Sequence, residues 1–198
     1  MDINNYKKEI FCIKNEPEFN DYAIELFQYQ YKNNETYNQY IQLLNYQPKN
    51  IIKYYDIPFL PIELFRNHHI SSNQNQHEAI FLSSGTTSNT NSQHYIYDLE
   101  LYKKSVLASF SLFFGNPQDF IFLCLVPNYN THINSSLSFM CMELIQKSNN
   151  EKSDFYINKY DDLKKVIIDC QKKNLKFILF GLSFEILHFA ENYNIDLT

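Results

Sequence analysis

Glycine is scarce in this 198-residue chain, which has only three. Average usage of about 7% would give roughly four times as many in a chain of this length. Helix termination accounts for Gly115, and the exit of a strand into a turn accounts for Gly181. Gly85, inside a run of serines and threonines, is the one glycine that these structural roles do not explain. It is therefore a candidate for a ligand-binding site.

Cysteine is also sparse, and its four positions lie far apart at Cys12, Cys124, Cys141 and Cys170. They show neither CxxC spacing nor a His at metal-ligand spacing, so neither a zinc site nor a disulfide framework is predicted. Cys124 and Cys141 lie in the apolar stretches FIFLCLVP and SFMCMELI, which favours packed, unreactive thiols. We expect reduced cysteines and no protein-bound metal.

The chain lacks an excess of basic residues and any long apolar run. Lys and Arg number 17 against 22 Asp and Glu, and no basic stripe alternates with aromatics, so nucleic acid is not the expected partner. The start, MDINNYKKEIF, has no apolar h-region and no small-residue cleavage site. We expect a cytoplasmic protein without a membrane span.

Tryptophan is absent, but 16 Tyr and 17 Phe supply side chains for a core and for any apolar ligand pocket.

The sequence pattern changes near residue 76. Residues 1–46 show the spacing of two helices separated by a polar break at Asn33 and Asn34, which predicts a helical hairpin. A short helix is expected beside Pro61, followed by a polar surface loop at 71–76. We therefore expect a helical N-terminal region over 1–76 and an α/β region over 77–198.

Strands and helices alternate after residue 76. Strands are predicted in HEAIFLSS, SQHYIYD, FIFLCLVP, DFYIN and KFILFGLS, with helices at about 99–114, 133–148, 159–173 and 184–192. This alternation predicts an α/β fold, with a central, mostly parallel sheet and covering helices, preceded by the helical hairpin. Because FIFLCLVP and KFILFGLS are almost wholly apolar, both are expected to be central strands.

The stretch FLSSGTTSNTNS, residues 81–92, runs from an apolar strand into a turn rich in hydroxyls. Gly85 would let the backbone approach an anion without a Cβ clash, and successive backbone N–H groups would form a concave nest. The hydroxyls of Ser83, Ser84, Thr86 and Thr87 would add donors. The pattern is neither GxxxxGKS nor GxGxxG, and on composition alone a plain polar hairpin loop is the commoner interpretation.

The Ser-Ser-Gly-Thr-Thr loop, the preceding IPFLPIELFRNHHI and the following LCLVPNYN and LFGLSFEILHFAE resemble the LuxE-like acyl-protein synthetase family. This family is similar to the adenylate-forming, AMP-binding enzymes that include acyl-CoA synthetases and phenylacetate-CoA ligase. The resemblance implies ATP-dependent activation of a fatty carboxylate as an acyl-adenylate, with Mg²⁺, and then transfer of the acyl group to a thiol. It also implies an acyl reductase or acyl-acceptor protein as partner.

The resemblance assigns the phosphates of ATP to the loop. The residues implied are Ser83, Ser84, Gly85, Thr86, Thr87 and Ser88. His94 of the following strand is within reach if the two strands pair, and the alternative is an ordinary surface His on that strand. No catalytic residue is assigned, because adenylation needs fixed donors rather than a protein nucleophile in its first step.

Several positions depart from the family pattern. Ser88 stands where the family usually has Gly, and Gln93 stands where an Arg usually precedes the His. The family also continues into a second nucleotide motif and an acyl-accepting Cys that have no counterpart before Thr198. The chain is therefore expected to be an amino-terminal portion. A second hypothesis is a vestigial module that retains the fold and binds nucleotide or acyl ligands without catalysis.

Three further features allow more than one interpretation. His68 is either a pocket residue or a solvated helix-end His. Ser183, in GLSFE, lacks the second Gly of GxSxG and is predicted to cap the last helix, with Phe184 and Leu187 packing inward. The helix at 99–114 either walls an acyl tunnel or contributes ordinary core, which its spacing favours. The side chains concerned are Tyr102, Phe110, Phe113 and Phe114.

Overall fold

The computed structural model describes residues 2–73, 76–83 and 91–195. The chain forms two compact units, Met1–Leu101 (unit 1) and Tyr102–Thr198 (unit 2). Within the described ranges, no helix has both the length and the apolar character needed to cross a membrane. The division expected after residue 76, between a helical part and a sheet-bearing part, stays a prediction.

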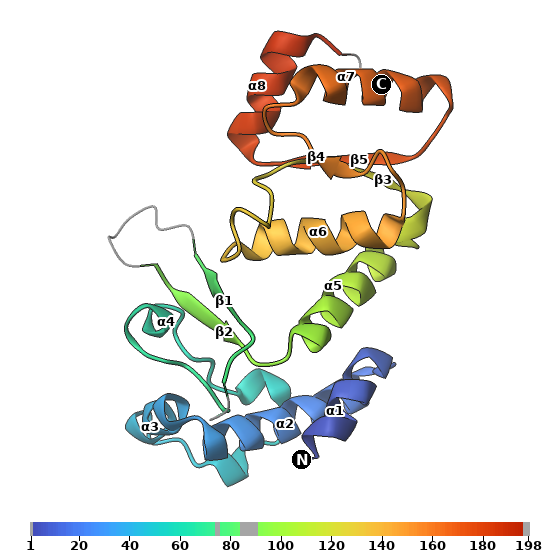
Figure 1. Ribbon diagram of the computed structural model, residues 1–198. Coiled ribbons are helices and arrows are strands. Elements are labelled where there is room, and N and C mark those ends of the chain that lie inside the picture. Colours follow the sequence, from blue (N-terminus) through green and yellow to red (C-terminus); the bar gives the residue numbers. More distant parts are fainter. Residues whose placement is uncertain (1, 74–75, 84–90, 196–198) are drawn as a thin grey trace. The chain divides into compact units, whose positions relative to one another are not determined.

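Unit 1 begins with helices and ends with a strand hairpin (Figure 1). Its described helices are α1 (Ile3–Glu9), α2 (Glu16–Asn33), α3 (Glu35–Leu43) and α4 (Leu64–Asn67), with 3-10 turns η1 (Ile10–Cys12), η2 (Pro48–Asn50) and η3 (Tyr54–Asp56). The predicted helical hairpin is confirmed as α2 and α3. The short helix expected beside Pro61 is confirmed as α4.

Asn34 joins α2 to α3 and caps both helices. Its backbone N–H donates to the Gln30 carbonyl at 2.8 Å, and its side-chain oxygen accepts from the Tyr37 N–H at 3.0 Å. The residue is buried, beside a core formed by Phe27, Tyr37, Ile41 and Ile51. The polar break seen in the sequence is therefore an ordered cap that satisfies backbone groups of two helices at once.

Unit 2 is built around a parallel sheet, as predicted. Its strands are β3 (Ile121–Leu125), β4 (Asp154–Phe155) and β5 (Phe177–Gly181), in the order β4-β3-β5. The helices are α5 (Leu99–Phe114), which starts in unit 1, and α6 (Ser136–Ser148), α7 (Tyr160–Lys172) and α8 (Ser183–Tyr193), with a 3-10 turn η4 (Pro117–Asp119). All four helices predicted after residue 76 are confirmed, and so is the α/β class.

The two faces of β3 pack on different helices (Figure 1). Leu123 and its same-face neighbours contact α7 and α8 through Leu163 and Phe189. Cys124 and its same-face neighbours contact α6 through Cys141. All five residues of β3 are buried, as expected for a parallel strand covered on both sides.

The prediction that KFILFGLS is central is wrong. Strand β5 pairs with β3 only, so it is an edge of this sheet in the part of the chain that the structure describes. All five of its residues are half-buried rather than buried. An apolar run indicates that side chains pack against other residues, but it does not show whether the strand pairs with one neighbouring strand or with two.

The packing predicted for the last helix is also wrong. Leu182 occupies the N-cap position and Ser183 is the first helical residue, with no side-chain cap bond. Phe184 and Leu187 are 64% and 57% exposed, whereas Ile186 and Phe189 pack against the core. The inward-facing residues of α8 are thus two positions later than expected, which at 3.6 residues per turn places the sheet-facing side almost opposite to the predicted one.

Candidate functional site

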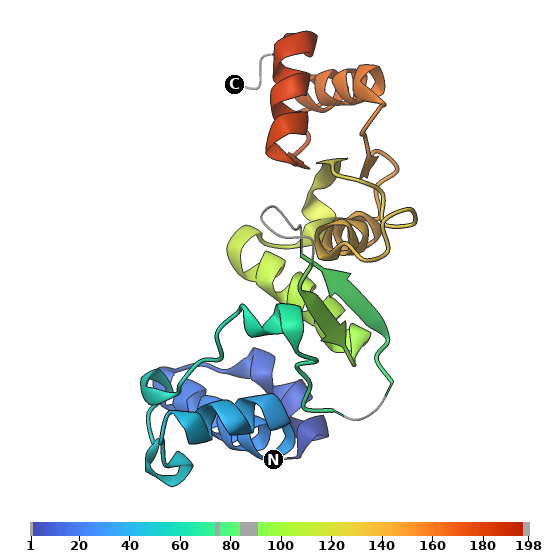
Figure 2. The same ribbon diagram turned by 90° about the vertical axis from the view of Figure 1, so that its left-hand side faces the viewer.

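The candidate site is the strand hairpin of unit 1 that carries the hydroxyl-rich loop. Strands β1 (Ala79–Leu82) and β2 (Gln93–Ile96) pair in antiparallel register from Ala79↔Ile96 to Leu82↔Gln93 and run side by side in Figure 2. Beyond the last pair, the Ser83 N–H donates to the Ser92 carbonyl at 3.0 Å. The Ser92 N–H donates to Ser83 Oγ at 2.9 Å. These two bonds hold both ends of the loop together.

Of the seven residues predicted to bind phosphate, the structure describes two, Ser83 and His94. Ser83 is exposed at the base of the loop, and His94 lies on β2, two residues after Ser92. The pairing of the two strands, on which the role of His94 depended, is confirmed. The predicted residues Ser84, Gly85, Thr86, Thr87 and Ser88 lie outside the described ranges.

His94 sits across from Phe81 on β1, with its ring edge-to-face on Phe65 of α4 at a centroid distance of 6.5 Å. Although the residue is exposed overall, partial desolvation of the imidazole lowers its pKa. The ring is therefore neutral at neutral pH, since its ordinary pKa of 6.5 is already below that value. A neutral imidazole can donate one hydrogen bond to a phosphate oxygen but brings no full positive charge.

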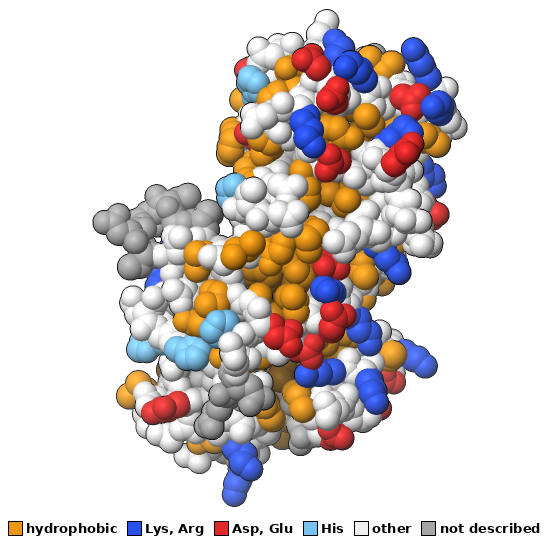
Figure 3. Space-filling model, viewed as in Figure 1, with side chains coloured by type: hydrophobic (Ala, Val, Ile, Leu, Met, Phe, Trp, Pro, Cys, Tyr) orange, Lys and Arg blue, Asp and Glu red, His pale blue; other side chains and the backbone are white. Residues whose placement is uncertain are grey.

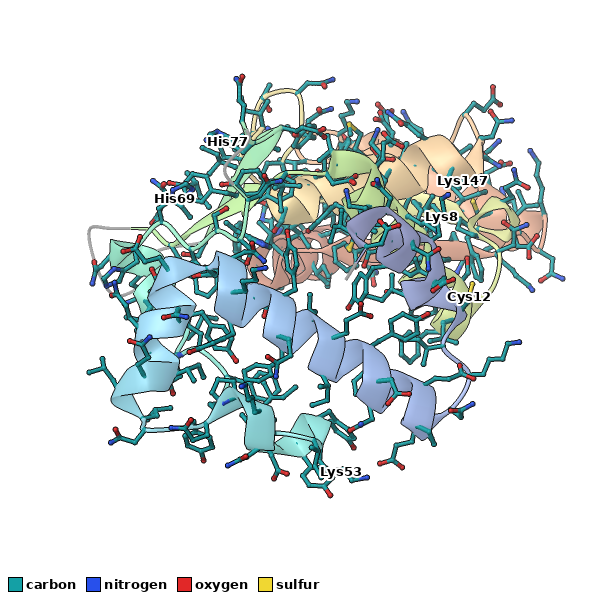
Figure 4. All side chains as sticks on the ribbon, turned by 90° about the horizontal axis from the view of Figure 1, so that it is seen from below. Lys8, Cys12, Lys53, His69, His77 and Lys147 are labelled. Carbon is teal, nitrogen blue, oxygen red and sulfur yellow. The ribbon has the colours of Figure 1, made fainter. Side chains whose placement is uncertain are left out.

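A second group of side chains lies on the hairpin and in the segments before it. We call it the imidazole–tyrosine cluster: His69, His77, Tyr95 and Tyr97. His69 Nε2 lies 3.0 Å from the Tyr97 hydroxyl, and the His69 ring lies 4.1 Å from the Tyr95 ring, centroid to centroid. The His77 ring is 5.3 Å from that of Tyr95. Figure 4 labels both imidazoles beside the strands, and Figure 3 shows histidine side chains gathered over this part of unit 1.

The cluster leads toward the loop through one further contact. The Tyr95 hydroxyl donates to the side-chain oxygen of Gln93, the residue that pairs with Leu82 at the last step of the hairpin. His77, Tyr95 and Tyr97 were not singled out from the sequence. The spacing of two residues between Tyr95 of β2 and Tyr97, which directly follows the strand, is the signal that could have placed them on a common face. His68 lies outside the cluster, exposed at the end of α4.

Within the described ranges, no three His, Cys, Asp or Glu side chains come together in a way that could hold a metal ion. The four cysteines are free, and Cys124, Cys141 and Cys170 are buried. A hydrogen bond with Cys141 and burial raise the pKa of the Cys124 thiol, and burial raises that of Cys170. These two thiols are protonated and unreactive at neutral pH, as the sequence predicted for Cys124.

Carboxylates gather at the opposite end of the hairpin from the loop. Glu78, before β1, accepts a hydrogen bond from the Leu99 N–H at 2.8 Å. Asp98, after β2, accepts from the Leu101 N–H at 2.7 Å and so caps the start of α5. Asp98 also pairs with Lys7 of α1. The hairpin is thereby attached to helices at its open end.

The capping carboxylate makes unit 1 sensitive to acid. The Lys7 hydrogen bond, followed by that from Leu101, holds the pKa of Asp98 below its ordinary value of 3.8. A carboxylate with a lowered folded-state pKa contributes stability above its unfolded pKa and loses that contribution as pH falls through the folded pKa. We expect Asp98→Asn to lower stability by about 1 kcal/mol at neutral pH, because it removes the charge that pairs with Lys7, and by less below about pH 4.

Urea denaturation of the two proteins at a series of pH values measures this difference. Asp119→Asn is the control, because Asp119 is an exposed carboxylate in η4 of unit 2. Because asparagine caps a helix about as well as aspartate does, equal stability of wild type and Asp98→Asn at neutral pH would contradict the contribution of the Asp98 charge and its pairing with Lys7.

Comparison with known proteins identifies one similarity. The family model described as acyl-protein synthetase, LuxE, matches residues 9–112, a range that contains the whole hairpin and its loop. Neither the curated proteins nor the solved structures contain a match.

Proposed function

Because this chain belongs to the LuxE acyl-protein synthetase family, we propose that it activates a fatty carboxylate with ATP and passes the acyl group to a thiol. The observation that carries the proposal is the hairpin. In the sequence, residues 83–92, with their hydroxyls and Gly85, connect two strands whose ends are joined by hydrogen bonds between Ser83 and Ser92. This connection lies within the residues that match the family.

In the first step of the proposed reaction, a carboxylate oxygen attacks the α-phosphorus of ATP and pyrophosphate leaves. The product is an acyl-adenylate, in which AMP has replaced oxide as the leaving group. In the second step a thiolate attacks the acyl carbon, AMP leaves and a thioester forms. The thiol loses its proton before or during this attack. Both steps need negative charge on phosphate to be held and neutralised rather than a protein nucleophile.

The residues at the base of the loop fit an anionic ligand. Ser83 is an exposed hydroxyl, and the next positions on β2, Gln93 and His94, are neutral groups with donor capacity. The carboxylates of Glu78 and Asp98 belong to the far end of the hairpin. Donors are thus near the loop and acids are away from it, as an anion site requires.

The donor set also suits Mg²⁺ that arrives with the nucleotide. Since no cluster of three or more His, Cys, Asp or Glu side chains that could hold a metal ion is present among the described residues, the ion would be held mainly by phosphate oxygens and water. Mg²⁺ keeps several waters and is often bound through substrate phosphates. When bound, it would neutralise phosphate charge.

A vestigial module is the alternative, and the base of the loop supplies its motivation. Gln93 accepts a hydrogen bond from Tyr95, and His94 is neutral. Neither residue therefore brings the cation that relatives of the family are expected to place there. Such a module would bind ligand without accelerating adenylation.

Isothermal titration calorimetry with ATP and Mg²⁺ tests the proposal. We expect a saturable heat that inorganic pyrophosphate competes away and adenosine does not, because the loop is proposed to hold phosphates. The absence of saturable heat with folded protein would overturn the proposal. Binding without acyl-dependent exchange of pyrophosphate into ATP would favour the vestigial alternative.

A further inference from the structure

Unit 2 contains a cavity of 460 Å³ between α5, α6 and one face of the sheet. Its deepest part is formed by Phe122 and Cys124 of β3 and by Cys141 of α6, all nearly inaccessible to solvent. One side of α5 forms a wall. Although no described residue of α5 is fully buried, Val106, Leu107 and Phe110 are half-buried and pack against the core that contains Phe122 and Cys124.

The wall of α5 is a continuous helical face. The residues that line the cavity include Tyr102, Ser105, Ser109, Phe110, Phe113 and Phe114. Spacings of three and four residues put them on one side of the helix. The prediction that the aromatic residues of α5 are ordinary core is wrong for Phe113 and Phe114, which are 77% and 61% exposed.

The lining is chemically uniform. Among the described residues that form it, none carries a charge, and its polar groups are hydroxyls and thiols. A ligand that fills it must therefore be neutral and mostly hydrocarbon where it lies inside, since an unpaired charge would lose its hydration. The second apolar cavity, 490 Å³ in unit 1, includes the amides of Gln30 and Asn34 and suits a pure hydrocarbon less well.

The dimensions match one long acyl chain. From Tyr102 to Phe114 the face of α5 is about 18 Å long at a rise of about 1.5 Å per residue. Two acyl chains end to end span a bilayer core of about 30 Å, so one chain is about 15 Å long. A cavity of about 150 Å³ accommodates the six carbons of benzene, which gives 460 Å³ room for about three times as many.

We propose that this cavity holds the hydrocarbon tail of the fatty substrate, with the carboxylate outside its apolar lining. The identity of the substrate rests on the proposed function. Binding of the tail does not require the nucleotide loop, because every lining residue belongs to unit 2.

The test is direct binding of cis-parinaric acid, a fluorescent fatty acid, in the absence of nucleotide. Ser109→Phe adds a ring at a position that lines the cavity, and we expect it to weaken binding by about tenfold or more, since excluding even two methylenes has an effect of this size. Ser111→Phe is the matched control, because Ser111 is exposed on the same helix and does not line the cavity. Its affinity should equal that of wild type.

A second variant and a second ligand distinguish binding in the cavity from binding elsewhere on the protein surface. Ser105→Phe, one turn earlier on the same face, should weaken binding as Ser109→Phe does. Far-UV circular dichroism and thermal unfolding establish that each variant is folded. The methyl ester of tetradecanoic acid should displace the probe as well as the free acid does, since the lining recognises the tail.

The outcomes distinguish this proposal from the proposed function. Retained probe binding in folded Ser109→Phe and Ser105→Phe would overturn the cavity assignment, whatever ATP does. A requirement for the free carboxylate would also overturn it. Failure of ATP titration together with loss of probe binding in the two cavity variants would overturn the proposed activation chemistry and support the tail site.

Discussion

Gly85→Val is expected to weaken ATP binding by more than about a hundredfold, because losing two charge-assisted hydrogen bonds costs about 3 kcal/mol or more. Valine adds a branched side chain at the one glycine of the hydroxyl-rich stretch, where the backbone is proposed to approach phosphate. The strands on either side are paired through their own backbone groups and through the Ser83–Ser92 bonds. The hairpin should therefore keep its fold while the ligand is excluded.

Titration calorimetry with ATP and Mg²⁺ measures the change in affinity, and Gly115→Val provides the control. Gly115 ends α5 with a φ of +95°, so the same substitution strains the backbone in unit 2 and leaves the loop of unit 1 untouched. The control should lose stability and keep its ATP affinity. Unchanged affinity in a folded Gly85→Val protein would remove the loop from the site.

Gly181→Ala is expected to destabilise unit 2 by about 3 kcal/mol, at the upper end of typical overpacking effects. A Cβ on Gly181 would lie 2.6 Å from Leu125 Cβ and 2.9 Å from the Leu125 carbonyl oxygen. Gly181 and Leu125 are register partners at the last step of the β3–β5 pair. The Leu182 N–H donates to the same carbonyl at 3.0 Å, so separating the strands there would also disturb this bond.

Urea denaturation followed by circular dichroism measures the loss, with Gly115→Ala as the comparison. A Cβ on Gly115 meets no atom within 4 Å, and its cost comes from the positive φ alone, about 1–2 kcal/mol. Gly181→Ala should therefore be the less stable of the two. The reverse order would mean that β3 and β5 are not paired in the register described.

Much of the fold could be predicted because it depends on local patterns. The helices α2 and α3, the four helices after residue 76 and the two strands β1 and β2 all follow from spacing and from polar breaks, whereas the pairing of β1 with β2 was left open. The edge position of β5 and the rotation of α8 could not be predicted in this way. Both depend on contacts between segments that are far apart in the sequence. An apolar residue such as Phe184 gives the same sequence pattern whether its side chain is buried or exposed.

The candidate site divides in the same manner. The loop and His94 were predicted from residue types in one short stretch, whereas the imidazole–tyrosine cluster joins His69 and His77 to Tyr95 of β2 and to Tyr97 just after it. Single histidines carry no periodic signal, so only the folded hairpin brings them to Tyr95. The apolar cavity of unit 2 is likewise assembled from α5, α6 and the sheet, which are far apart along the chain.

The sequence by itself determined the α/β class and the likeness to acyl-protein synthetases, and it predicted a separate role for each of the three glycines. These properties reside in composition and in short motifs, where one residue type has one conformational consequence. Only the tertiary structure decided that Gly181 is required by the close approach of Leu125, and that the aromatic face of α5 borders a cavity. Contacts between distant segments are set by how whole elements pack, and no local pattern encodes that distance.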